Sequence, residues 1–95
     1  MGFILSPSAQ VDIEDIWTYT AQRWGLDQAE TYVGLIGASI VSAAARPRLG
    51  RACDDIRAGY FKLRAGSHLI FYRMAEADID VVRILHERMD FPQHL

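Results

Sequence analysis

Basic side chains that could hold an anion are concentrated in the last third of this 95-residue chain. Six of them fall in three short runs that predict neighbouring strands: Lys62, Arg64, His68, Arg73, Arg83 and His86. Two more follow in the C-terminal tail: Arg88 and His94. Any one such residue is usually solvated, or paired with a nearby carboxylate such as Asp54, Asp55, Asp78 or Asp80. As a group on one uncovered sheet face, they indicate contact with a polyanion or an acidic partner.

The strands that must position these residues are rich in β-branched and aromatic side chains. They are predicted at Tyr60–Ala65, His68–Met74 and Ile79–His86, each bounded by turn residues. The connections are only Gly66-Ser67 and residues 75–78, and such short links join antiparallel neighbours. The C-terminal half therefore predicts a three-stranded meander.

The N-terminal half must cover or extend this sheet. Phe3–Leu5 is a short apolar run that we expect to form an additional strand. Ser6 is a predicted N-cap, and Pro7 suits the first helical position because its missing N–H is not needed there. A helix is predicted from Pro7 to Trp24, with one apolar stripe, and Gly25 ends it.

A second helix is predicted to start at Asp27, acting as N-cap in a capping box with Glu30, and to stop at Pro47. About two residues would join the helices, which makes them an antiparallel hairpin. Arg46–Arg57 is expected to be a loop. The predicted fold is α+β, β-α-α-β-β-β, with the helical hairpin packed on a small, mainly antiparallel sheet.

Composition limits the classes of protein to consider. The length suits a single domain over residues 1–95. The net charge of −2 argues against a chain that binds nucleic acid over its whole surface, although the arginines lie mostly in the second half. A lone cysteine, Cys53, excludes an internal disulfide and suits the reducing cytoplasm. No membrane span, signal peptide, metal signature or phosphate loop is predicted, so no cofactor is implied.

Three aromatic residues of the predicted helices could be core residues or anchors for a partner: Trp17, Trp24 and Tyr32. Packing between the helices is the usual role of such side chains. A two-helix layer on a small sheet nevertheless leaves much of its outer surface bare. Any of the three that points outward would be a candidate anchor.

An ordered set of short motifs resembles the ParE toxins of bacterial toxin–antitoxin modules. The N-terminal part of the set is Ala9-x-x-Asp12-Ile13-x-x-Ile16, Tyr19-Thr20, Trp24-Gly25 and Gln28-Ala29. The C-terminal part is Arg57-x-Gly59, Gly66-x-His68-x-Ile70-Phe71-Tyr72-Arg73, Val82-Arg83-Ile84-Leu85-His86-x-x-Met89-Asp90 and His94-Leu95. The likeness covers essentially the whole chain, and the predicted element order agrees with the RelE-like fold of that family.

The resemblance implies a toxin that inhibits DNA gyrase by trapping it on cleaved DNA. It also implies a ParD-like antitoxin whose C-terminal segment wraps the toxin, and no catalytic activity of the toxin itself. Under this hypothesis the basic sheet face and the Met89–Leu95 tail engage gyrase, the DNA that it holds, or both. Trp17, Trp24 and Tyr32 are then candidates for contact with the antitoxin.

The RelE-type ribosome-dependent mRNA endonucleases share this fold and are the alternative. The places of their catalytic side chains are held here by Lys62, Arg64, His68, Arg88 and His94. Histidine can transfer a proton and arginine can stabilise an oxyanion. However, these nucleases usually have arginine where this chain has His68, and the tail has no tyrosine. An interaction module without toxicity is a third alternative.

Overall fold

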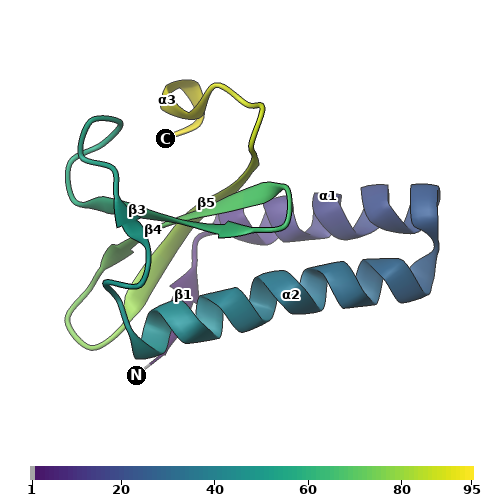
Figure 1. Cartoon of the computed structure of the whole chain (residues 1–95), viewed down its shortest axis with the longest axis horizontal. Coiled ribbons are helices and arrows are strands. Elements are labelled where there is room, and N and C mark those ends of the chain that lie inside the picture. The colour runs from purple at the N-terminus through teal and green to yellow at the C-terminus, as the bar shows by residue number, and fades with distance from the viewer. Residues whose placement is uncertain (1) are drawn as a thin grey trace.

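The computed structural model describes residues 2–95, which form a helical hairpin on one face of a sheet (Figure 1). In chain order the elements are β1 (Phe3–Leu5), α1 (Pro7–Trp24), α2 (Leu26–Ala45), β2 (Arg51–Ala52), β3 (Tyr60–Ala65), β4 (His68–Met74), β5 (Ile79–His86) and α3 (Phe91–His94). The predicted α+β fold is confirmed, and so are the bounds of α1 and of the three C-terminal strands. Two short elements, β2 and α3, were not predicted.

The sheet of the described residues has five strands in the order β1-β5-β4-β3-β2. All neighbours are antiparallel except β1, which runs parallel to β5 with Leu5 opposite Val81. Ser6 ends β1 and starts α1. Its N–H bonds to the Val81 carbonyl, and its hydroxyl donates to Val82 and accepts from the Ala9 N–H. The predicted N-cap is therefore confirmed, and it also fixes α1 to the edge of β5.

The connection between the two long helices is shorter than predicted. Gly25 alone joins them, with φ of 97°, a conformation that residues with a side chain rarely adopt. The chain therefore reverses within one residue, and α2 starts at Leu26 with Gly25 as its N-cap. The prediction of Asp27 as N-cap with Glu30 was wrong, because Asp27 already lies inside the first turn of α2.

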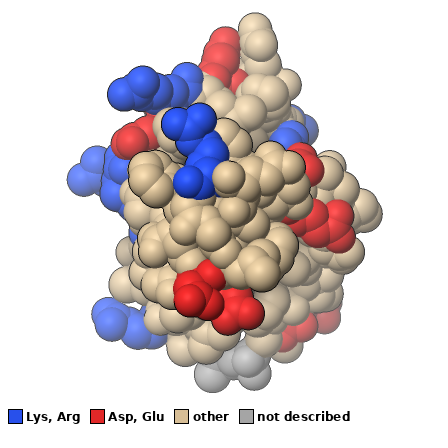
Figure 2. Space-filling model, turned by 90° about the vertical axis from the view of Figure 1, so that its right-hand side faces the viewer, with Lys and Arg blue, Asp and Glu red and all other residues tan. Residues whose placement is uncertain are grey.

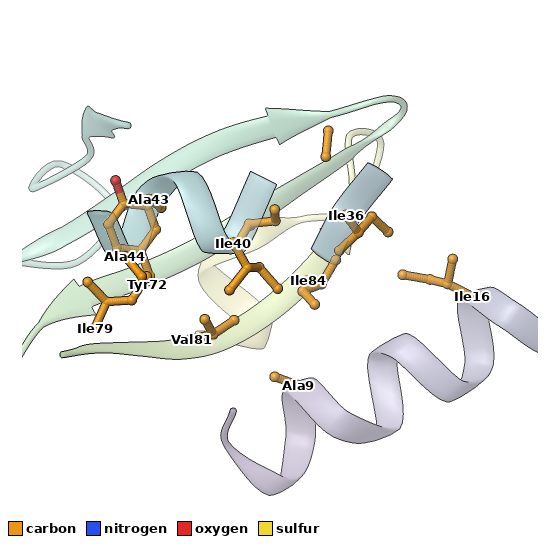
Figure 3. Packing of buried hydrophobic residues seen from close by; sticks show 12 residues of the cluster. Ala9, Ile16, Ile36, Ile40, Ala43, Ala44, Tyr72, Ile79, Val81 and Ile84 are labelled. Carbon is orange, nitrogen blue, oxygen red and sulfur yellow. The ribbon is translucent and has the colours of Figure 1, made fainter. Parts of the chain in front are cut away.

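The main core lies between the helical hairpin and the sheet (Figure 3). Ala9 and Ile16 of α1 and Ile36, Ile40 and Ala43 of α2 point towards the strands. They meet buried side chains of β4 and β5: Ile70, Tyr72, Ile79, Val81 and Ile84. Burial of such side chains contributes about 1.5–3 kcal/mol each, so this layer holds the hairpin on the sheet.

The opposite face of the sheet, here called the outer face, is also covered. Its buried cluster consists of Cys53, Tyr60, Leu69, Phe71 and Leu85. Ile56 from the β2–β3 loop and Phe91 and Leu95 from the tail pack over this cluster. The expectation of an uncovered sheet face was therefore wrong. The 46–57 segment and the tail supply apolar side chains that cover the centre of this face.

Within residues 2–95, no helix combines the length and the apolar character needed to cross a bilayer. Cys53 is a free, buried cysteine, and burial raises the pKa of its thiol. Its environment is therefore that of a small core residue.

The Tyr72 hydroxyl ties the segment after α2 to the sheet. It donates to the Pro47 carbonyl (2.8 Å) and accepts from the Gly50 N–H (2.9 Å). A Cβ on Gly50 would lie 2.6 Å from this hydroxyl and 2.8 Å from the Lys62 carbonyl. Residue 50 is therefore restricted to glycine by close approach.

We expect Gly50→Ala to destabilise the protein by about 1–3 kcal/mol, because the added methyl group must displace backbone. Gly34→Ala is the matched control. A Cβ there has no neighbour within 4 Å, and alanine in a helix should stabilise by roughly 0.5–1 kcal/mol. Urea denaturation of both variants measures the two changes. Equal stabilities would contradict the close approach at Gly50.

Candidate functional site

Arg83 and Asp12 form an ion pair that joins β5 to α1. The guanidinium Nε and Nη2 atoms each donate to the Asp12 carboxylate at 2.8 Å, and both side chains are largely buried. The bond to Asp12 raises the pKa of Arg83. Asp12 Oδ2 also accepts from the Ile84 N–H at 2.9 Å, on the edge of β5 that β1 is too short to cover. Arg83 is thus the best-anchored cation of the sheet, and its charge is neutralised.

The C-terminal tail is attached to the same arginine. Arg83 Nη1 donates to the His94 carbonyl at 3.3 Å, and Arg57 donates to the Leu95 carbonyl. Between these two bonds the Phe91 ring packs on Phe71, with 5.0 Å between the ring centroids. The tail therefore lies as a strap across the outer face of the sheet.

The other predicted cations are distributed between the two faces. The side chains of Phe61, Leu63 and Ala65 point towards the helices, so Lys62 and Arg64 lie on the outer face. Arg64 pairs with Glu87 at 2.8 Å, and Arg73 pairs with Asp80 at 3.3 Å. These pairs are exposed and contribute at most about 1 kcal/mol each to stability. Arg88 is exposed just beyond β5, and His94 is half-buried in α3.

His68 and His86 lie on the helix side, at the end of the sheet nearest the hairpin tip. They are opposite each other on β4 and β5, with ring centroids 5.3 Å apart. The Tyr32 hydroxyl lies 2.7 Å from Nδ1 of His68 and accepts from the Ser67 N–H. Burial, and then the neighbouring His86, lower the pKa of His68. Asp12 and Glu87 oppose this shift more weakly.

A cleft of about 820 Å³ opens beside these histidines, where the helical hairpin extends beyond the sheet (Figure 1). Its walls are Asp15, Ile16, Tyr19, Thr20, Trp24, Gln28, Tyr32, Ser67, His68 and His86. Figure 2 views the molecule from the hairpin tip: uncharged surface fills the middle, cations lie mainly above and to the left with carboxylates among them, and further carboxylates lie below and to the right. A mainly apolar cleft with a few polar groups is typical of a binding site.

The aromatic candidates take different positions. Trp24 is 69% exposed and Tyr32 is half-buried, and both line the cleft. Trp17 is partly buried and does not line the cleft. Sequence reasoning did not select Tyr19, which is 59% exposed in the cleft wall, with the Arg23 guanidinium 5.5 Å from its ring centroid. The sequence signal for Tyr19 was its spacing of four residues from Arg23, which places both side chains on the same exposed face of the helix.

Among the residues that the structure describes, no three His, Cys, Asp or Glu side chains group as a metal site requires. The side chains that hold the places of the endonuclease catalytic residues lie on two different faces of the sheet. Lys62, Arg64 and the tail with His94 lie on the outer face, whereas His68 lies on the helix side beside Tyr32. Arg64 is already paired with Glu87. The structure therefore does not bring these side chains together on one face of the sheet.

The family model described as "ParE toxin of type II toxin-antitoxin system, parDE" matches residues 3–91. Toxin ParE1 of Mycobacterium tuberculosis is 56% identical over 94 residues, covering 98% of this chain and 96% of the relative. Toxin ParE1 of Caulobacter vibrioides is 41% identical over 91 residues, covering 96% and 94%. Toxin ParE of Escherichia coli is 30% identical over 96 residues, covering 99% and 92%.

A solved structure of the chromosomal ParDE toxin–antitoxin system from P. aeruginosa contains a chain with the same fold. The TM-score is 0.78 with 19% sequence identity, covering 90% of this chain and 95% of that one. At that identity, the likeness extends to the fold alone.

We expect Asp12→Ala to destabilise the protein by about 3 kcal/mol, because it leaves Arg83 as a largely buried charge without its partner and Ile84 N–H without an acceptor. Asp15→Ala, an exposed carboxylate on the same helix, should change stability by less than about 0.5 kcal/mol. Chemical denaturation measures both variants. Adding Arg83→Met to Asp12→Ala should recover part of the loss, and strictly additive losses would contradict the pairing.

Proposed function

Because this chain belongs to the ParE toxin family of type II toxin–antitoxin systems, we propose that it inhibits DNA gyrase and is neutralised by a ParD-like antitoxin. The observation that carries the proposal is the alignment with toxins of that name along nearly the whole chain. Gyrase and its DNA are in the cytoplasm, where a single reduced cysteine is expected.

The proposal assigns no catalytic residue to this chain. Its support is the division of the nuclease-position side chains between two sheet faces, with His68 next to Tyr32 and Arg64 next to Glu87. A nuclease site needs its acid, base and cations around one phosphate. A toxin that acts by binding its target needs only a stable surface.

We propose that gyrase is contacted by the outer face and the tail. The candidate residues are Lys62, Arg64, Arg73, Arg88 and His94, and Arg83 supports them by fixing the tail. Arg88 is exposed and has no ion pair among the described residues, so its charge is available to a partner. His86 accepts the Arg88 N–H through Nδ1 and holds the start of this tail.

The cleft at the hairpin tip is the proposed antitoxin site. Trp24 and Tyr19 of the cleft wall are 69% and 59% exposed, and Tyr32 lines the cleft beside His68. A partner helix with an apolar face would bury these rings, and buried aromatic side chains usually dominate such interfaces. Trp17 lies outside the cleft and could contribute only at its margin.

The proposed target is tested with purified protein in two assays run side by side. We expect loss of gyrase supercoiling with accumulation of linear DNA, and intact message in a ribosome-dependent mRNA cleavage assay. Cleaved message with unaffected gyrase would place the protein with the endonucleases. No effect in either assay would favour an interaction module without toxicity.

The contact surface is tested with Arg73→Glu and Arg88→Glu combined. Both side chains are exposed, so loss of the Arg73–Asp80 pair and the new Glu–Asp80 repulsion should lower the melting temperature only slightly, whereas inhibition of gyrase should weaken at least tenfold. Arg23→Glu on α1 makes the same kind of substitution outside the outer face and the tail, and it should inhibit normally. Arg83 is not a suitable site for this test, because its substitution would also break the Asp12 pair. Full inhibition by the double variant would rule out this surface.

Trp24→Ala or Tyr19→Ala should weaken binding of the antitoxin by roughly 30-fold or more, since truncation of an interface anchor costs about 2 kcal/mol. Calorimetric titration with the antitoxin of the same operon measures the change. Val11→Ala is the control, because Val11 is a 52% exposed residue of α1 outside the cleft. If all three variants bind alike, the antitoxin does not occupy the cleft.

A further inference from the structure

A second cationic surface, absent from the sequence-based candidates, lies at the end of α2 away from the hairpin tip. Arg46 and Arg48 are exposed in the connection between α2 and β2, and Arg51 is exposed at the start of β2; residues 46–51 are here called the arginine loop. A hydrogen bond from the Leu49 N–H to the Arg46 carbonyl (2.8 Å) closes a turn in this loop. The three side chains therefore start from a chain segment at most about 18 Å long.

The loop adds its charge to a cation of the sheet. Arg51 on β2 lies directly opposite Lys62 on β3, so both side chains point to the same face. Like charges in directly opposite positions destabilise a sheet. The arrangement therefore has a stability cost in the free protein that an anion between the two side chains would relieve.

The four cations of this surface have no carboxylate partner among the described residues. The ion pairs of the chain involve Arg64, Arg73 and Arg83 instead. Asp54 and Asp55 follow β2 closely, but the Asp54 carboxylate accepts from the Gly59 N–H at 2.8 Å. The backbone of the loop is held in place by the Tyr72 hydroxyl through Pro47 and Gly50. The loop thus presents free guanidinium groups from a fixed base.

We propose that the arginine loop and Lys62 bind the phosphate backbone of duplex DNA. Duplex DNA carries one negative charge per roughly 1.7 Å of axis, so a compact group of cations meets several phosphates without individual matching. Guanidinium groups suit this contact because their planar donors bind phosphate in a bidentate manner. This inference rests on the proposed function, because the DNA that the loop would contact is the DNA held by gyrase.

The experiment measures binding of the full chain to a fluorescent DNA duplex by anisotropy between 50 and 200 mM KCl. Four phosphate contacts predict a slope of log K against log[salt] of about −3.6, which is an affinity loss of about 150-fold over that range. Arg46→Gln, Arg48→Gln and Arg51→Gln combined leave one contact, so the slope should fall to about −0.9 and the loss to about 3.5-fold.

The matched control is Gln22→Glu and Arg23→Glu combined, which lowers the net charge by the same three units at the exposed end of α1 and should keep the steep slope. Absence of duplex binding at 50 mM KCl, or equal slopes in the two variants, would overturn the inference. So would loss of antitoxin affinity in the loop variant without any DNA binding, which would assign the loop to a protein partner. If the inference fails in any of these ways but the unsubstituted protein still inhibits gyrase, the proposed function stands.

Discussion

The Asp12 carboxylate accepts a backbone N–H that the short strand β1 leaves without a partner on the edge of β5. β1 is only three residues long because the chain must turn into α1 at Ser6, so the second half of β5 has no neighbour on that edge. An unpaired backbone N–H beside a core is costly. Asp12, one and a half turns into α1, accepts the Ile84 N–H, and its negative charge then requires a cation, which Arg83 supplies.

This ion pair also connects the core to the C-terminal tail on the outer face. Arg83 donates from its third guanidinium nitrogen, Nη1, to the His94 carbonyl, so the tail that covers Phe71 and Leu85 is joined through Arg83 to α1. The Asp12–Arg83 ion pair thus connects the helical hairpin, the edge of β5 and the cluster on the outer face. Arg83 is therefore mainly a structural residue, and charge available to partners must come from other side chains.

The parts of the fold that could be predicted are those set by local chemistry. Ser6-Pro7 starts α1, Gly25 ends it, and Gly66-Ser67 turns β3 into β4, so those bounds needed only neighbouring residues. The partner of Arg83 could not be found in this way. Nearby acids were considered, whereas the actual partner is 71 residues away. β2 and α3 are too short to show a hydrophobic periodicity in the sequence. Tertiary contacts stabilise them instead, such as the packing of Phe91 of α3 on the buried cluster of the outer face.

The two ends of α2 provide separate surfaces for partners. Gln28 and Tyr32 line the cleft near its start, and Arg46 follows its last residue, which places the two surfaces roughly 21–27 Å apart along the helix. A single helix of an antitoxin in the cleft would not reach the arginine loop unless its chain continued across the sheet. Neutralisation through the cleft alone would therefore leave the loop open to DNA. An antitoxin that blocks the proposed action on gyrase must accordingly either extend along the molecule or exclude gyrase by its bulk at the hairpin tip.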